Sequence, residues 1–137
     1  MLDTNTVSDF LLRRSETLTQ RATEYSRTQG KLTTSVLTIF EVTRGFYRVN
    51  QPLRALAFQG RMDSWEVLPF DPEAADLAGR IESELLRNGT PIDLTDIFIA
   101  AVAVAHHRTL VTRNTRHFEP IAALGFTLPL QDWTLPP

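Results

Sequence analysis

The sequence predicts an α/β domain with a mainly parallel central sheet. Short apolar segments alternate with amphipathic segments along the chain, and no internal repeat, low-complexity run or long linker interrupts the alternation. Strands that alternate with helices are typical of a parallel sheet covered by helices. Ligands of such sheets bind outside the carboxyl ends of the strands. A length of 137 residues fits one domain, which we expect to cover residues 1–137.

The first half of the chain predicts two strands and four helices. Residues 1–3 form the end of a first strand, and Asp3 closes it. Gly30 ends the second helix, and Pro52 lies in the first turn of the fourth. One helical stripe marks the third helix; it comprises Val36, Ile39, Phe40 and Tyr47. The expected helices cover residues 4–13, 16–28 and 36–48 and a segment that opens at 50–52, with a strand at 32–35.

The second half predicts three further strands and two helices. Asp71 and Pro72 are typical of a helix N-cap and first position, and Asn88 with Gly89 ends that helix near residue 86. Asp93 or Thr95 can cap the next, strongly apolar helix, which runs to about residue 106. The expected strands cover residues 65–69, 109–112 and 126–130, and an irregular tail follows.

Composition narrows the possible classes of protein. No cysteine is present, which excludes disulfides and thiolate chemistry and fits a reducing compartment. The start of the chain does not resemble a signal peptide, and the longest apolar run, residues 97–105, is too short to span a bilayer. We therefore expect a soluble, cytoplasmic protein with no membrane partner. The net charge of −2 means that any nucleic-acid contact must come from a local basic patch.

Three acids in or beside apolar sequence are the candidate chemical groups. Taken singly, Asp3 reads as a helix cap, Glu41 as a solvated helix residue, and Asp96 as an acid favoured by the dipole of its helix. Together, three carboxylates at one end of a parallel sheet would repel one another without a cation. Ligands that are all oxygen suit Mg²⁺ or Mn²⁺ rather than zinc. Such an ion lowers the pKa of a bound water and stabilises charge on a phosphodiester.

Four short motifs in order resemble those of PIN domains, and the whole chain is similar to the VapC-type toxins of bacterial toxin–antitoxin pairs. The motifs are Leu2-Asp3-Thr4-Asn5 with Ser8, Thr38-Ile39-Phe40-Glu41-Val42 with Gly45, Asp96-Ile97-Phe98-Ile99-Ala100-Ala101, and residues 110–118. The resemblance implies an α/β/α sandwich and an Mg²⁺- or Mn²⁺-dependent endoribonuclease that cuts structured RNA such as tRNA. It assigns Asp3, Glu41 and Asp96 as catalytic metal ligands. It implies that Asn5 and Thr112 hold these carboxylates in place.

The last motif departs from the family pattern. Many members have a fourth acid where Asn114 or His117 stands, and one negative charge fewer should weaken a second metal ion more than a first. We therefore expect one well-held ion. Asn114 can still offer its carbonyl, His117 is expected at the surface rather than as a ligand, and Glu119 is a possible substitute acid. Asp93, three residues before Asp96, is expected to cap rather than to bind metal.

The resemblance also implies an antitoxin partner, whose C-terminal segment covers the active site, and a second copy of the chain. Apolar residues between the second, third and fourth helices could form the antitoxin groove or simply fill the core; they are Phe40, Phe46, Tyr47, Leu53, Leu56 and Phe58. Arg113 and Arg116 could contact RNA phosphates, or be solvated charges. Two alternatives remain: a catalytically weak or silent binding module that acts through its partner complex, and a DNA-directed nuclease.

Overall fold

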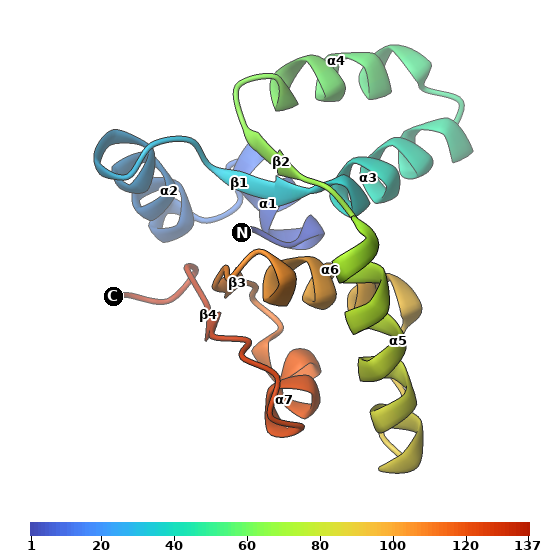
Figure 1. The fold of residues 1–137 in the computed structure, drawn as a ribbon. Coiled ribbons are helices and arrows are strands. Elements are labelled where there is room, and N and C mark those ends of the chain that lie inside the picture. Colours follow the sequence, from blue (N-terminus) through green and yellow to red (C-terminus); the bar gives the residue numbers. More distant parts are fainter.

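The computed structural model describes all 137 residues and contains seven helices and four short strands (Figure 1). Both termini and every connection are included. The helices are α1 Thr4–Leu11, α2 Glu16–Thr28, α3 Val36–Arg48, α4 Pro52–Met62, α5 Pro72–Arg87, α6 Leu94–Ala105 and α7 Thr115–Ala123. The strands are β1 Thr33–Ser35, β2 Glu66–Leu68, β3 Leu110–Val111 and β4 Leu130–Gln131.

The strands form two parallel pairs, β1 with β2 and β3 with β4, which the first three residues connect. The Leu2 amide donates to the carbonyl of Thr33, the first residue of β1, at 2.8 Å. On the other side, the Val111 amide donates to the Met1 carbonyl at 2.8 Å and the Asp3 amide donates to the Val111 carbonyl at 3.0 Å. Leu2 and Val111 form a parallel bridge. The prediction of a parallel sheet with residues 1–3 as a strand end is confirmed.

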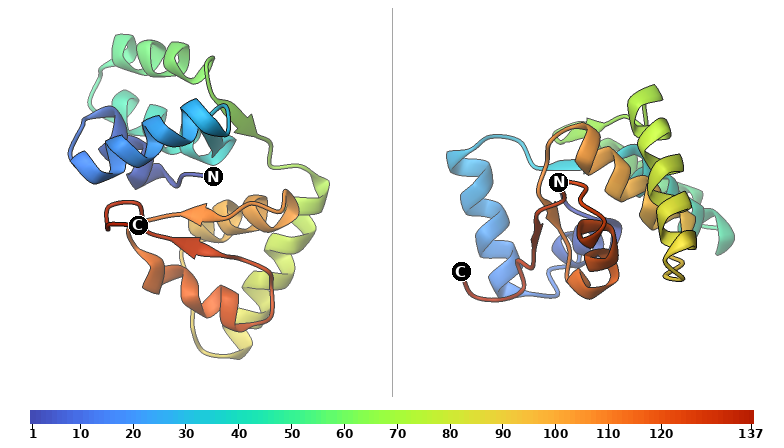
Figure 2. Two further views of the ribbon diagram at one scale, coloured as in Figure 1. Left: turned by 90° about the vertical axis from the view of Figure 1, so that its left-hand side faces the viewer. Right: turned by 60° about the horizontal axis from the view of Figure 1, so that its bottom comes forward.

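Helices cover both faces of this sheet. Successive strand residues point to opposite faces, and the core divides accordingly. Met1 and Leu110 belong to one buried cluster with residues of α5, α6 and α7. Their chain neighbours Leu2 and Val111 belong to the other cluster, with residues of α1, α2 and α4. Figure 2 shows the N-terminal end lying between these two groups of elements. The predicted α/β/α sandwich is therefore confirmed.

Helix α7, Thr115–Ala123, was not predicted. It is nine residues long and contains Pro120. Proline has no amide proton and is disfavoured inside helices, so the sequence here does not indicate a helix. Phe118 and Ile121 anchor it in the core, at 2% and 0% exposure. The turn before it carries Asn114 and leads His117 back toward α6.

The last strand was predicted too early. Residues 126–130 were expected to form it, but β4 covers only Leu130–Gln131 and pairs with β3 from Leu110 opposite Leu130. Pro129 has no amide proton to donate, so regular pairing begins after it. No helix in the structure combines the length and apolar character needed to cross a membrane.

Candidate active site

Asp3 lies where the first strand ends and α1 begins. Its Oδ1 accepts a hydrogen bond from the Thr6 amide at 2.8 Å, so the capping interpretation is correct. A cap needs no burial, yet only 6% of Asp3 is exposed. Burial raises the pKa of its carboxyl, hydrogen bonds from Thr112 and Thr6 oppose the shift, and the negative charge of Asp96 adds to it. Asp3 is therefore a costly buried acid that faces a second carboxylate.

Glu41 lies on α3 and is held by α1. The Thr4 hydroxyl donates to its Oε1 at 2.6 Å, and the Thr38 hydroxyl lies 3.1 Å from that of Thr4. The carboxyl is half-buried, and burial is the main cause that raises its pKa; the Thr4 hydrogen bond opposes this shift. Asp96 also raises the pKa of Glu41 through its charge, whereas Arg44 lowers it. Glu41 thus belongs to the same electrostatic site as Asp3.

Asp96 lies in the first turn of α6 and meets α7. His117 Nε2 is 2.8 Å from Asp96 Oδ2, and the two side chains are 35% and 30% exposed. His117 was expected at the surface rather than as a ligand, and its side chain is partly exposed, but its contact with Asp96 was not predicted. Helix α7, which carries His117 to Asp96, was not recognised in the sequence.

The other predicted residues divide between the site and the surface. Thr112 is fully buried, contacts Asp3, and accepts a hydrogen bond from the Asn114 amide at 3.0 Å. The side chains of Asn5 and Asn114 are exposed and make no hydrogen bond. Asp93 was expected to cap α6. It occupies the N-cap position, but its side chain makes no capping hydrogen bond. The last candidate, Glu119, is exposed on α7.

The charges at this edge of the sheet fit a divalent cation. Burial is the main cause that raises the pKa of Asp3 and Glu41, and the negative charge of Asp96 raises both further, so it destabilises the ionised forms of these two acids. No three acid or histidine side chains are close enough to hold one ion jointly. Mg²⁺ commonly uses only one or two protein carboxylates and completes its shell with water and substrate phosphate. The donor set therefore fits Mg²⁺ or Mn²⁺.

Asp9, which the sequence did not single out, anchors one of the predicted RNA contacts. It is 4% exposed, and its oxygens lie 3.1 Å from Arg113 Nη1 and 3.3 Å from Arg14 Nη1. Arg113 thus reaches across from the turn before α7 to α1, while its side chain remains 62% exposed. Arg116 is exposed and makes no ion pair. In sequence, Asp9 looks like any polar residue of an amphipathic helix.

Replacing Asp9 with asparagine is expected to lower the free energy of unfolding by about 1 kcal/mol. The substitution removes the charge that both arginines face, and the exposure of the arginines limits the loss. Urea unfolding at neutral pH measures the effect. Asp63→Asn is the control, because Asp63 is exposed and makes no ion pair. Equal stability of the two variants would contradict an anchoring role for Asp9.

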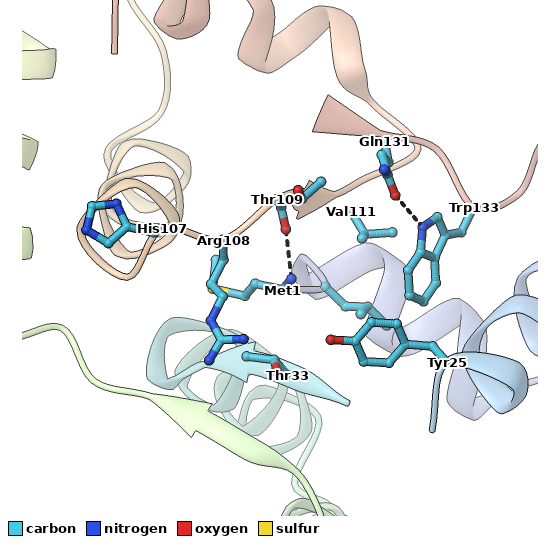
Figure 3. A pocket seen from close by; sticks show the side chains of 10 residues that line it. Met1, Tyr25, Thr33, His107, Arg108, Thr109, Val111, Gln131 and Trp133 are labelled. Atoms are coloured by element: carbon cyan, nitrogen blue, oxygen red, sulfur yellow. Dashed lines mark hydrogen bonds between the residues drawn. The ribbon is translucent and has the colours of Figure 1, made fainter. Parts of the chain in front are cut away.

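A separate hollow of about 350 Å³ lies at the opposite edge of the sheet (Figure 3). Its walls include residues at the starts of the strands, such as Met1, Thr33 and Thr109, together with Tyr25 and Trp133. The Met1 nitrogen donates to the Thr109 carbonyl at 2.8 Å. None of the three predicted acids lines this hollow. The carboxylate edge, at the carboxyl ends of the strands, is therefore the better candidate for phosphodiester chemistry.

Comparison with known proteins agrees with this fold. The profile of the PIN domain matches residues 1–124. The tRNA(fMet)-specific endonuclease VapC of Shigella flexneri is 33% identical over 135 residues, which cover 98% of this chain and 97% of the relative. Ribonuclease VapC2 of Haemophilus influenzae is 33% identical over 125 residues, 90% of this chain and 92% of the relative.

Solved structures give the same result. The chain superposes on the DNA-bound VapBC structure from Salmonella typhimurium with a TM-score of 0.83 and 33% identity, covering 97% of this chain and 96% of that one. The VapBC-1 structure from nontypeable Haemophilus influenzae gives a TM-score of 0.84 with 25% identity, over 98% of both chains. The chain therefore belongs to the PIN-domain family and, within it, to the VapC ribonucleases.

Proposed function

We propose that this protein is a metal-dependent endoribonuclease toxin whose catalytic carboxylates are Asp3, Glu41 and Asp96. The observation that carries the proposal is that buried Asp3 at the end of the first strand and half-buried Glu41 on α3 both lie within reach of the charge of Asp96 on α6. The ribonuclease names of the relatives support RNA as the substrate. Because one of them is named as specific for tRNA(fMet), we propose tRNA as the RNA class and the cytoplasm as the place of action.

The residues around the acids have distinct proposed roles. One or two of the carboxylates Asp3, Glu41 and Asp96 would bind Mg²⁺ or Mn²⁺ directly and the rest through water in its shell, and the ion would supply Lewis-acid stabilisation to the phosphodiester. Thr4 and Thr112 orient Glu41 and Asp3 through their hydroxyls. His117 holds Asp96 at the side where it meets α7. Asn5 and Asn114, being exposed, are free to contact substrate.

The proposed partners are a VapB-like antitoxin and a second copy of the chain. The titles of the structural neighbours name VapBC complexes, which supports the antitoxin. The groove for its apolar segment lies between α1, α3 and α4 rather than between α2, α3 and α4. It has a volume of about 440 Å³, and Phe46 and Phe58 line it beside Leu11, Leu12 and Val42. Phe40, Tyr47, Leu53 and Leu56 do not line it and are exposed.

The deciding experiment is cleavage of a total tRNA pool by wild type and by Asp96→Asn, with Mg²⁺, with Mn²⁺ and with EDTA. Wild type is expected to cut only with metal, and the variant, which keeps side-chain size and loses charge, is expected not to cut. Matched single-stranded DNA separates an RNA-directed from a DNA-directed nuclease. Both proteins must be folded and free of antitoxin. If neither of them then cuts RNA or DNA, the binding-module alternative becomes the preferred interpretation.

Replacing Thr4 with valine is expected to lower cleavage about 10-fold, whereas Thr4→Ser should retain it. Valine removes the hydroxyl that donates to Glu41 at 2.6 Å, and loss of such a supporting bond typically costs 10–100-fold in metal affinity or activity. The same bond opposes the rise in the Glu41 pKa, so the loss should be greatest at acidic pH. Initial rates over a pH series measure this. Equal rates for valine and serine variants would contradict the proposed role of Thr4.

A further inference from the structure

We propose that an exposed face of α3 binds unpaired bases of single-stranded RNA next to the catalytic edge. This stacking face consists of Phe40, Arg44, Tyr47 and Arg48, which bound a shallow hollow of about 520 Å³ together with the buried Thr43. The proposal rests on the proposed ribonuclease function and adds a substrate-binding surface to it.

The stacking face has the geometry of one helical stripe. Its four residues are spaced at i, i+4, i+7 and i+8, so they lie on the same side of α3. Arg44 of this stripe lies near enough to the predicted ligand Glu41 for its charge to lower the pKa of that carboxyl, and the stripe extends for roughly 12 Å along the helix from Phe40. Helix α3 itself leads away from β1 and the sheet (Figure 1). An RNA strand lying on this face would therefore be continuous with the carboxylates.

Exposure and charge indicate what the face binds. Phe40 and Tyr47 are 49% and 57% exposed, so their rings are available for contact, and the Arg44 guanidinium lies 4.9 Å from the centre of the Phe40 ring. Arg44 and Arg48 are in no ion pair within the chain, unlike Arg27, Arg80 and Arg87, which pair with acids on their own helices. In a protein of net charge −2, two arginines without an ion-pair partner beside two exposed rings make a local site for a polyanion with aromatic bases.

An alternative occupant is another protein surface, and the side chains argue against it. Exposed Leu53 and Leu56 on α4 are aliphatic, as expected for a face that packs against protein. The face on α3 instead alternates rings with guanidinium groups. Base–aromatic stacking tolerates any sequence, because every base has a flat face, and arginines that follow the backbone complete such sites. Single-stranded RNA is therefore the occupant that the chemistry favours.

The test measures RNA binding without cleavage. All variants are made in an Asp96→Asn background, and the affinity for a short, fluorescein-labelled, unpaired RNA is measured by anisotropy over a salt series. Tyr47→Leu is expected to weaken binding about 10-fold, while Tyr47→Phe keeps the ring and should retain affinity. Arg48→Gln is expected to reduce the slope of log affinity against log salt by about 0.7. Arg27→Gln, on α2 and paired to Glu24, is the charge-matched control and should leave the slope unchanged.

The outcomes separate this proposal from the proposed function. All substituted side chains are exposed, and thermal melts identical to that of the parent establish that the fold is intact. If Tyr47→Leu and Arg48→Gln bind RNA as well as the parent, the stacking face is not an RNA site. If Tyr47→Leu also sediments as a monomer where the parent is a dimer, the face is a self-interface instead. If these variants lose RNA affinity while the wild-type enzyme proves unable to cleave, the stacking face stands and the catalytic proposal falls.

Discussion

Asp3→Asn is expected to raise the melting temperature of the protein at neutral pH although it abolishes the proposed cleavage. Burial and the nearby charge of Asp96 raise the pKa of the Asp3 carboxyl, so the folded state pays a cost for keeping it ionised. Asparagine has no such charge and retains an oxygen that can accept the Thr6 amide hydrogen bond. We expect a gain of about 1 kcal/mol, which is about 4 °C for a chain of this size.

The pH dependence gives this prediction its sign. The folded-state pKa of Asp3 lies above the ordinary value of 3.8, which applies to the unfolded chain. At a pH between the unfolded and the folded pKa, the folded protein therefore binds more protons than the unfolded chain. The free energy of unfolding therefore falls as pH rises through this window and stays reduced above it. Glu41 adds a contribution of the same sign, starting from 4.5. Asp3→Asn should remove the Asp3 part and flatten the curve.

Thermal melts between pH 4 and 8 measure the difference between wild type and variant. Asp76→Asn is the matched control, because Asp76 is an exposed acid on α5 paired only with Arg80, and its removal should change the melting temperature little. Cleavage by Asp3→Asn is expected to fall by at least 100-fold, since even residues that only support metal ligands contribute 10–100-fold. A variant less stable than wild type at every pH would show that Asp3 is a structural cap and not a strained functional acid.

The parallel sheet and the order of the acids could be predicted because both rest on strong local patterns. Alternating apolar strands and helices define the sheet, and three acids interrupt the apolar sequence: Asp3 closes the first strand, Glu41 lies within α3 and Asp96 lies in the first turn of α6. Packing of the α/β/α class places Asp3 and Glu41 within reach of the charge of Asp96. The assignment of the three acids as metal ligands comes from the resemblance to PIN domains and stays a prediction.

The supporting contacts could not be predicted, because they depend on residues that carry no distinctive pattern. Thr4, Thr38 and Thr112 look like ordinary polar residues in sequence, yet the hydroxyls of Thr4 and Thr112 contact Glu41 and Asp3, and that of Thr38 contacts Thr4. His117 faces Asp96 only because α7 turns back toward α6, and the proline within α7 obscured that helix. Asp9 is buried by a long-range partner, Arg113, that lies more than a hundred residues away in the chain.

Mg²⁺ or Mn²⁺ is expected to raise the melting temperature of wild type and to have a much smaller effect on Asp96→Asn. An ion that binds only the folded state stabilises it by about 2.7 kcal/mol when its free concentration is 100 times the dissociation constant. In this protein it would also relieve the repulsion by which Asp96 raises the pKa of Asp3 and Glu41. The metal should therefore stabilise wild type in two ways, by its contacts to the carboxylates and by relief of the repulsion from Asp96.

Melts with each metal, before and after addition of EDTA, measure this stabilisation independently of any RNA substrate. Asp76→Asn controls for loss of an exposed charge, and its metal-induced shift should equal that of wild type. Removal of the negative charge in Asp96→Asn alone should already relieve part of the repulsion, so this variant should melt above metal-free wild type while responding little to metal. Equal shifts in wild type and Asp96→Asn would mean that the ion binds elsewhere. Asp96 would then not be a metal ligand, even if cleavage depends on it.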